Sequence, residues 1–402
     1  MTTICSFGTY LPAWGTDAAR QLGVDEDAVT LAVAAGLAAI AGARDVVVRR
    51  VVLISHDLPL LDGGNGAVLL AALGLPDHLP VVEQIGGAPA VLDAVTEAGP
   101  GTLIVAADGA PAGAAACLTG GVGLDVTAVR RHVGSLPVRS RGLDGVVRDY
   151  DDTRLAWDRG GRRAINALEL AEKPVAVAGV TVRQAAGLAQ GPPPVMPTTG
   201  GSAALFALAA VGELGAAGLV LGVEQASATA VRVGVGRTTP AIRRDERAAR
   251  PALNLRVTPG PEIAISLAAY GRAFEPKVRW EAGRCDACGT LALPPRHRCL
   301  GCGSEKGWSL TPLPRTGAVY TVVTVHVPVP GVPTPYSLAI VELDDVEVRS
   351  LVKITGAEPG STAIGDRGQL VLRRGAVRAG IPDYGYALLP QQTAGQDLEA
   401  IR

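Results

Sequence analysis

The chain has 402 residues, which is long for one small core and suits two or three domains of typical size. Lys and Arg number 37 against 38 for Asp and Glu, so the charge balance favours neither nucleic acid nor an anionic membrane as a partner. Apolar residues make up 48%, but no stretch approaches the roughly 20 needed to span a bilayer, and no export signal is visible at the start. We therefore expect a cytoplasmic protein with no membrane or nucleic-acid partner.

Up to about residue 235, Val-rich segments alternate with Ala- and Leu-rich segments. The alternation predicts an α/β fold, because buried strands of a mostly parallel sheet read as short apolar runs separated by helices. The predicted strands are Val51 to Ser55, Thr102 to Ala107, Val175 to Gly179 and Gly218 to Val223. The predicted helices are Asp25 to Ala41, Gly86 to Ala98 and Gly201 to Leu214.

The composition then changes over residues 237–256, RTTPAIRRDERAARPALNLR, which we interpret as a linker. Its arginines could meet the phosphates of a CoA group, since guanidinium binds phosphate in a bidentate way, or could belong to a solvated linker balanced by Asp245 and Glu246. The arginines concerned are Arg243, Arg244, Arg247 and Arg250.

Four of the six cysteines form two Cys-x-x-Cys pairs in the segment CDACGTLALPPRHRCLGCG. The four are Cys285, Cys288, Cys299 and Cys302. Two such pairs in a chain without an export signal favour metal over disulfides, and four thiolates around Zn²⁺ leave no open position for water. We expect a structural zinc site, with an iron centre or a redox dithiol pair as alternatives, and an exposed His297 outside the ligand set.

Segments rich in β-forming residues follow the cysteines: Ala318 to Val327, Tyr336 to Leu343 and Gln369 to Arg373. Pro and Gly turns separate them, which is typical of a small barrel. An oligonucleotide-binding barrel would need an aromatic platform and a basic groove, and we see neither in the sequence. Tyr336 and Arg315 are weak candidates for contact with a CoA group.

From Arg284 onward the chain resembles the zinc-ribbon plus OB-fold proteins that accompany thiolases and 3-hydroxy-3-methylglutaryl-CoA synthases. The resemblance rests on the two cysteine pairs, Trp308, RTGAVYTVVTVH and PYSLAIVELDD, in that order. It implies a rubredoxin-like zinc ribbon followed by an OB-fold barrel. In that family the module helps to dock or channel acyl-CoA between partner subunits.

The first 270 residues resemble the synthase branch of the thiolase superfamily. The resemblance rests on the order of DEDAVTLAVAAGLAAI, VVLIS, NGAVLLAALGLP, EQIGGAPAVLDAV, GTLIVAADGAPAGAAACLTG and TTGGSAALFALAAV. It implies a five-layered αβαβα domain whose second half begins near Ala156. We expect this domain over residues 1–270, a linker helix and zinc ribbon over 271–312, and an OB-fold over 313–402.

The family's nucleophile is a cysteine at the start of a buried helix, in the pattern Cys, one residue, Gly-Gly. Here the pattern reads Gln84, Ile85, Gly86, Gly87, so a glutamine that cannot carry an acyl group replaces the cysteine. Cys5 lies in the predicted first strand and Cys117 in a predicted core strand, and we interpret both as buried structural thiols.

The other catalytic groups of the family are also missing. Its histidine would fall in AVAGVTVRQ, but no histidine lies between His132 and His297. The asparagine of its Asn-Thr-Gly turn aligns with Thr198, and its glutamate falls near Ser55, His56 and Asp57. His56 could be a polar substitute or a surface histidine at a strand end.

Two hypotheses follow. In the first, the chain is a non-condensing subunit that binds acyl-CoA and assembles with a catalytically intact thiolase- or ketosynthase-like subunit, as a homodimer or heterotetramer, in polyketide-like biosynthesis. In the second, it is an active decarboxylase or acyltransferase that uses Gln84 with His56 or Asp57 and forms no cysteine acyl-enzyme. Loss of several cooperating catalytic groups favours the first.

Overall fold

The computed structural model describes residues 1–142, 145–150, 152–234, 236, 238–261 and 264–391. The chain divides into two compact units. The first comprises residues 1–22, 27–69 and 75–251, and the second comprises 23–26, 70–74 and 252–402. The domain boundaries expected from the sequence stay predictions. Among the described residues, no helix is long and apolar enough to cross a membrane.

The first half of unit 1 is a mixed sheet with strand order β5-β4-β6-β7-β1. Strands β4, β5 and β6 are parallel, and β7 runs antiparallel between β6 and β1. Its elements are β1 (Thr2–Leu11), α1 (Ala28–Gly42), β4 (Arg50–Ile54), α2 (Asn65–Leu73), β5 (Val81–Gln84), α3 (Ala88–Glu97), β6 (Thr102–Gly109) and β7 (Ala112–Thr119), with a small hairpin, β2 (Trp14–Thr16) and β3 (Ala19–Gln21).

The second half repeats most of this arrangement with strand order β11-β12-β13-β8. The pairing is again parallel between the first two strands and antiparallel between the next two pairs. Its elements are β8 (Leu124–Val133), β9 (Arg139–Arg141), β10 (Val147–Asp149), α4 (Thr153–Ala156), a π-helical turn η1 (Trp157–Gly161), α5 (Arg162–Ala167), β11 (Ala176–Ala178), α6 (Val182–Leu188), α7 (Ser202–Glu213), β12 (Gly218–Glu224) and β13 (Ser227–Gly234).

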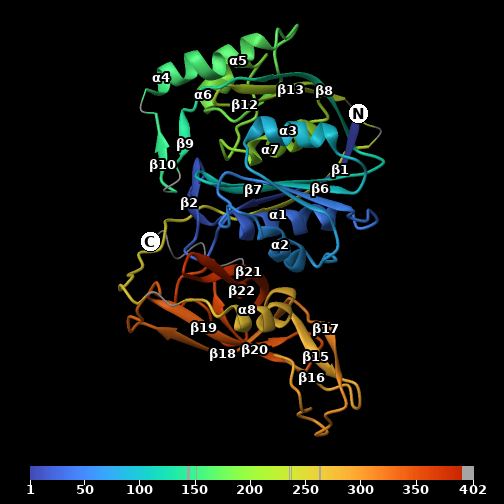
Figure 1. Ribbon diagram of the computed structural model, residues 1–402, viewed down its shortest axis with the longest axis vertical. Helices are drawn as coiled ribbons and strands as arrows, with labels where there is room; N and C mark the ends of the chain where they lie inside the picture. Colours follow the sequence, from blue (N-terminus) through green and yellow to red (C-terminus); the bar gives the residue numbers. More distant parts are fainter. Residues whose placement is uncertain (143–144, 151, 235, 237, 262–263, 392–402) are drawn as a thin grey trace. The chain divides into compact units, whose positions relative to one another are not determined.

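Among the described residues, the two strand orders belong to one ten-stranded sheet, because the start of β1 pairs with the start of β8. The sheet folds into two layers, which form five layers with their helices (Figure 1). Helix α1 packs on β1, β6 and β7, helices α3 and α7 lie between the sheets, and α5 and α6 cover the far face of β11 and β13. This confirms the expected αβαβα arrangement. The boundary expected near Ala156 is wrong, because β8 ends at Val133 and already pairs with β13 of the second half from Asp125 onward.

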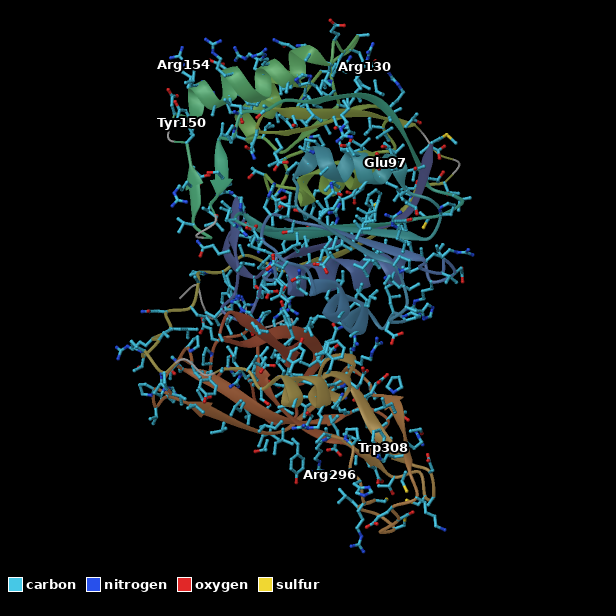
Figure 2. The ribbon with its side chains drawn as sticks, in the orientation of Figure 1. Glu97, Arg130, Tyr150, Arg154, Arg296 and Trp308 are labelled. Carbon is cyan, nitrogen blue, oxygen red and sulfur yellow. The ribbon has the colours of Figure 1, made fainter. Side chains whose placement is uncertain are left out.

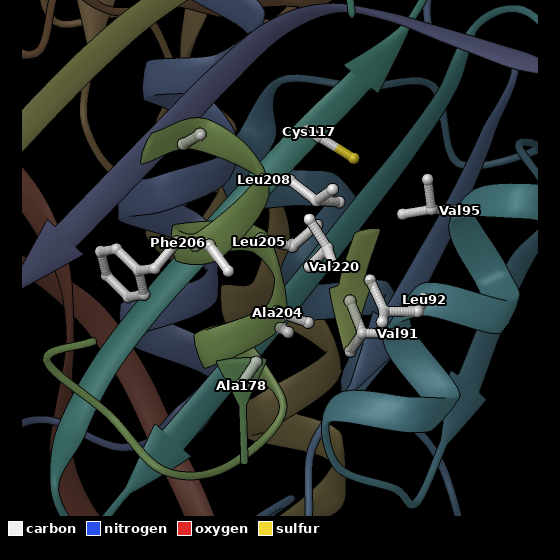
Figure 3. Packing of buried hydrophobic residues seen from close by; sticks show 14 of the residues in the cluster. Val91, Leu92, Val95, Cys117, Ala178, Ala204, Leu205, Phe206, Leu208 and Val220 are labelled. Atoms are coloured by element: carbon white, nitrogen blue, oxygen red, sulfur yellow. The ribbon is translucent and has the colours of Figure 1, made fainter. Parts of the chain in front are cut away.

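The central layer is the core of unit 1 (Figure 3). Val91, Leu92 and Val95 of α3 belong to one buried cluster with Leu205 and Leu208 of α7. Alanines fill much of α7, SAALFALAAVGE, and their small side chains let the helix approach both sheets. Because α7 is buried on nearly every side, its sequence shows little amphipathic pattern.

The segment predicted as a linker contains a strand. Ala241–Glu246 form β14, which pairs in parallel with Ser6 to Leu11 of β1. The prediction of a linker is therefore wrong for these residues. The error has a physical reason: β14 lies at a sheet edge with polar, partly exposed side chains, so it lacks the apolar run that marks the buried strands.

Unit 2 contains a short helix, a three-stranded ribbon and a closed five-stranded barrel with neighbours in the order β18-β19-β20-β22-β21. This confirms the barrel expected from the sequence. Its elements are α8 (Leu267–Phe274), a π-helical turn η2 (Glu275–Arg279), β15 (Glu281–Cys285), β16 (Leu291–Ala292), β17 (Trp308–Pro312), β18 (Thr316–Val325), β19 (Tyr336–Leu343), β20 (Arg349–Ile354), β21 (Arg367–Arg378) and β22 (Ile381–Pro390).

Candidate functional site

Two carboxylates occupy equivalent places in the two halves of unit 1. Asp108 is the seventh residue of β6 and Glu224 is the seventh residue of β12. Each one caps the central helix of the other half: Asp108 accepts from the backbone N–H of Gly201 and Ser202 at α7, both at 2.9 Å, and Glu224 accepts from Gly87 at α3 at 2.9 Å. A carboxylate is stabilising there, because a helix N-terminus has unpaired N–H groups and partial positive charge.

Asp108 forms a closed structural cap. The residue is only 5% exposed and also accepts from the Ser202 hydroxyl, which bonds to Thr198 Oγ1 at 2.7 Å. Burial raises the pKa of Asp108, while the hydrogen bonds from Ser202 and Gly201 oppose that rise. Thr198, a weak catalytic candidate from the sequence, is 1% exposed and therefore belongs to this buried network.

Glu224 has a different environment, because its second oxygen pairs with His56. Their side chains are 26% and 35% exposed, so the pair can meet solvent. The hydrogen bond to Glu224 raises the pKa of His56 against the effect of burial. Burial alone would raise the pKa of Glu224, but the hydrogen bond and charge of His56 lower it. Both shifts favour a charged pair near neutral pH.

The pair fills the space in front of α3. A Cβ atom at Gly87 would lie 2.6 Å from Glu224 Oε1, so only glycine lets the carboxylate approach the helix so closely. A negative group already held there repels a thiolate or oxyanion at the same place. The N-terminus of α3 is therefore neutralised by the protein's own side chains.

The other predicted catalytic residues do not join the pair. Gln84 is the last residue of β5 and is exposed, and its carbonyl accepts from the N–H of Ser55 at 3.1 Å. Asp57 Oδ2 instead accepts from the N–H of Gly109 at 2.8 Å. At the end of β11, where the family histidine is expected, the chain has Gly179.

Sequence reasoning missed both Asp108 and Glu224. A signal for them existed, because TLIVAADG and GLVLGVE are two apolar strands that each have an acidic residue at the seventh position. Comparison of the two halves as a repeat would have aligned these positions. The partner of each carboxylate could not be found in this way, since it lies in the other half.

An open cleft of about 420 Å³ lies in unit 1, and neither His56 nor Glu224 lines it. Val223 and Gln225, the chain neighbours of Glu224, contribute to its wall. The remaining wall comes from β9, the residues around β10, η1 and the segment after β11. The polar and aromatic residues of this wall are Arg139, Asp149, Tyr150, Thr153, Trp157, Gln184 and Gln225. A cleft of this size is within the usual range for small-molecule sites.

The arginines proposed for phosphate have other surroundings. Arg244 lies on β14 and pairs with Glu213 at 2.6 Å and Glu246 at 3.1 Å. Arg243 is exposed on the same strand, and the carbonyl of Arg247 accepts from Arg20 at 2.7 Å. The guanidinium carbon of Arg250 lies 5.6 Å from the ring centroid of Trp14. Structural contacts thus explain Arg244 and Arg250.

The cysteines outside the ribbon lie in strands, as expected. Cys117 is fully buried in β7, and burial raises the pKa of its thiol. Cys5 lies in β1, is half-buried, and donates to the carbonyl of Leu118 at 3.1 Å. Neither arrangement favours a reactive thiolate, because desolvation disfavours the charged form of the sulfur.

The four ribbon cysteines converge, and their sulfur atoms all lie within 4.8 Å of one another. The Sγ atoms of Cys285 and Cys302 are 3.8 Å apart, and those of Cys288 and Cys299 are 3.5 Å apart. Tetrahedral Zn²⁺ with bonds of about 2.3 Å places its sulfurs about 3.8 Å apart, so the donors fit a zinc ion. Gly289 and Gly303, with φ of 76° and 73°, allow the turn after each pair.

The remaining weak candidates lie in unit 2. His297 is exposed beside the ribbon cysteines and is outside the converging set. In the barrel, Lys353 Nζ lies 5.3 Å from the ring centroid of Tyr336, and the guanidinium carbon of Arg315 lies 4.9 Å from that of Tyr386. These contacts describe packing and identify no CoA site.

Comparison with known proteins gives family matches in unit 2. Residues 277–306 match the family described as ChsH2, rubredoxin-like zinc ribbon domain, and residues 310–373 match ChsH2, C-terminal OB-fold domain. Benzoylsuccinyl-CoA thiolase subunit BbsA of Thauera aromatica is 32% identical over 106 residues, which are 26% of this chain and 70% of BbsA. A probable enoyl-CoA hydratase alpha subunit of Thermomonospora curvata is 39% identical over 83 residues, but these are only 20% of this chain and 25% of that subunit.

Solved structures align with different parts of the chain. The Ltp2-ChsH2(DUF35) aldolase aligns with 33% of this chain and 98% of its own, at 28% identity and a TM-score of 0.26. Cerulenin-bound OleA of Xanthomonas campestris aligns with 58% of this chain and 96% of its own, at 13% identity and a TM-score of 0.47. Both TM-scores are below 0.5, so the fold of unit 1 is described from its own strand order and layers and not from these structures.

Proposed function

Since this chain belongs to the family of ChsH2-type zinc-ribbon and OB-fold proteins, we propose that it is a non-condensing subunit of an acyl-CoA-dependent acyltransferase or condensing complex. In this proposal, unit 1 is a degenerate thiolase-like domain that binds acyl-CoA without forming an acyl-enzyme. The catalytic chemistry belongs to a thiolase- or ketosynthase-like partner, with polyketide-like biosynthesis as the setting.

One observation carries the proposal: the Glu224 carboxylate, paired with His56, is bound to the N-terminus of α3. A condensing enzyme of the resembled superfamily needs that helix end for its nucleophile and for developing negative charge. Here the carboxylate of an ion pair already occupies the helix N-terminus, and Gln84 stands where the nucleophile is expected. Restoring a cysteine alone would therefore not restore condensation.

The cleft lined by Val223 and Gln225 supports the binding part of the proposal. Its volume of about 420 Å³ suits part of an acyl thioester, and its wall combines apolar side chains with the amides of Gln184 and Gln225. Binding is separable from covalent chemistry, because the cleft wall contains neither the pair nor Gln84.

A free sheet edge supports the assembly part. Among the described residues, β5 pairs only with β4 and is the last strand of its sheet. Unpaired edges are a template for strand pairing with another chain. Proteins of the resembled superfamily form dimers beside the nucleophile helix, and β5 leads into the equivalent helix, α3. Both relatives are themselves described as subunits.

A second function, an enzyme with acid–base chemistry, is favoured by the same pair in a different role. An imidazole held by a carboxylate is a common proton-transfer arrangement, and both members of the pair are partly exposed. In this alternative, His56 and Glu224 would act on a thioester without a cysteine. In the version expected from the sequence, Gln84 acts with His56 or Asp57. In the present version, Glu224 takes over as the group that acts with His56.

The test is purification of the tagged chain from its native host, followed by mass spectrometry and assays of malonyl-CoA and acyl-CoA turnover. We expect a stoichiometric thiolase- or ketosynthase-like chain with an intact cysteine, turnover by the complex, and none by the isolated subunit. Turnover by the isolated subunit that is lost in Gln84→Ala, or in His56→Gln but not in His78→Gln, would contradict the proposal. His78 is a suitable control because its side chain is 80% exposed and lies outside the cleft.

A further inference from the structure

We infer that the cleft lined by Trp157, Val223 and Gln225 selects thioesters with a flat, uncharged aromatic acyl group, which it holds against Trp157. The inference rests on the proposed function, since it names the substrate class of the proposed acyl-CoA site. It comes from four features of the cleft. These are its aromatic side chains, the π-helical turn that carries one of them, the left-handed backbone of Gln225, and the charge of the rim.

Two aromatic residues line the cleft in a chain that has only 3% aromatic residues. Trp157 begins η1, and Tyr150 follows β10, where Figure 2 shows it beneath α4, the helix that carries Arg154. Val138, Val180 and Val223 add an apolar wall. Aromatic faces favour flat rings over flexible chains, because stacking adds to the burial of apolar area.

The turn that carries Trp157 is built for close packing. A Cβ atom at Gly161 would lie 2.6 Å from Cζ3 of Trp157, so this glycine makes room for the indole. A Cβ atom at Gly160 would lie 2.6 Å from the carbonyl oxygen of Gln225. Short π-helical turns inside α-helices are frequent at functional sites. Here the turn fixes Trp157 in the wall formed with Val223 and Gln225.

Gln225 lies in the two-residue turn between β12 and β13 and has a left-handed conformation, with φ of 48°. A non-glycine residue in this region carries strain, and such residues gather at binding sites. Its amide and that of Gln184 provide hydrogen-bonding groups in the cleft wall. These groups suit the carbonyl of a thioester and need no charge on the acyl group.

The rim offers no net charge. Among the described lining residues, the charged ones are Arg139 and Asp149, which pair through two hydrogen bonds of 2.8 and 3.3 Å. An acyl group with its own carboxylate would have to compete with Asp149 for Arg139. The cleft therefore favours a neutral acyl group over a dicarboxylic one.

The experiment compares binding of benzoyl-CoA, cyclohexanecarbonyl-CoA and heptanoyl-CoA, which have seven acyl carbons each, with free CoA as the reference. Isothermal titration of the full chain should give benzoyl-CoA an affinity about three- to tenfold above heptanoyl-CoA, the range expected for one stacked aromatic pair. Trp157→Leu should remove the difference, while Trp157→Phe should retain most of it. Trp308→Leu, at a 44% exposed tryptophan outside the cleft, should leave it unchanged.

Equal affinities for the three thioesters, or a preference that survives in Trp157→Leu, would overturn the inference. If Trp157→Leu does not fold, Tyr150→Ala at an exposed position should still reduce the preference. The proposed function fails separately: it fails if the chain binds no thioester and copurifies with no thiolase-like subunit. Equal binding of all three thioesters with the partner present would reject the selectivity alone.

Discussion

Asp108 and Glu224 show that carboxylates at equivalent positions of the two halves can have different roles when their surroundings differ. Both are the seventh residue of an apolar strand, and both cap a central helix. Asp108 is enclosed and accepts three hydrogen bonds from α7 and Gly201, whereas Glu224 accepts one backbone bond and pairs with the partly exposed His56. The first arrangement is explained by stability, and the second marks the candidate site.

At this scale we expect Asp108→Asn to destabilise the protein by about 2–3 kcal/mol. Each carboxylate oxygen of Asp108 accepts from one backbone N–H, of Gly201 or of Ser202, and the NH₂ group of asparagine would face one of these donors with another donor. Urea unfolding at pH 7 measures the change. Glu224→Gln is the matched control and should cost less, since solvent can reach the exposed carboxylate and imidazole. A larger loss in Glu224→Gln than in Asp108→Asn would contradict the structural assignment.

At the scale of elements, prolines explain the main difference between the two halves. The first half has β5 beside β4, but among the described residues no strand covers the outer edge of β11. The segment 191–197, GPPPVMP, lies at the corresponding place in the chain order. Proline has no N–H to donate to a ladder, so this segment cannot continue the sheet. The second half is therefore a four-stranded version of the first.

The zinc ribbon is an element whose structure depends on its ligands. Its strands β15, β16 and β17 are short, and the ribbon has little core of its own, so metal binding should supply most of its folding free energy. We expect one zinc per chain by mass spectrometry of metals. Cys288→Ser should abolish most of the zinc content and the hydrogen-exchange protection of residues 281–312.

The control for this prediction is Cys5→Ser, a half-buried cysteine of β1 outside the converging set. It should leave both zinc content and ribbon protection unchanged. Protection of residues 281–312 that persists after verified zinc removal would show that the ribbon folds without its metal. If the chain contained iron instead of zinc, the predicted metal would be wrong, but the predicted set of four cysteine ligands would stand.

At the scale of the whole molecule, the chain combines a repeated α/β unit that lacks the expected nucleophile with a ribbon and barrel of the ChsH2 type. Among the described residues, the α/β unit has an unpaired sheet edge at β5 and a cleft lined by Val223 and Gln225. The proposed division between a binding subunit and a catalytic partner uses both features. It predicts that assembly depends on the sheet edge and not on the pair.

We expect Ile85→Lys to prevent assembly with the copurifying subunit while changing the stability of the isolated chain by less than about 0.5 kcal/mol, the usual range for exposed positions. Ile85 follows β5 and is 60% exposed, so a charge there would be desolvated by a paired strand. Size-exclusion chromatography with light scattering measures the assembly. Val327→Lys, at a 74% exposed site, is the control. An intact complex in Ile85→Lys would place the interface elsewhere.

Local pattern was enough to predict much of this protein. Apolar runs predicted β4, β6, β11 and β12 within about two residues, and the two Cys-x-x-Cys pairs predicted the converging metal ligands. These features depend on neighbours in the chain, which is why one sequence suffices. The glutamine at position 84 likewise shows, without any structure, that no thiol is available there.

Only the tertiary structure decided which groups form the candidate site. His56 meets Glu224 across 168 residues, and Asp108 meets Ser202 across 94, so no local pattern could pair them. These contacts exist because the two halves place α3 and α7 back to back between the sheets, which brings the strand ends of each half to the helix of the other. The same stacking places β14 beside β1, where the sequence alone had suggested a linker.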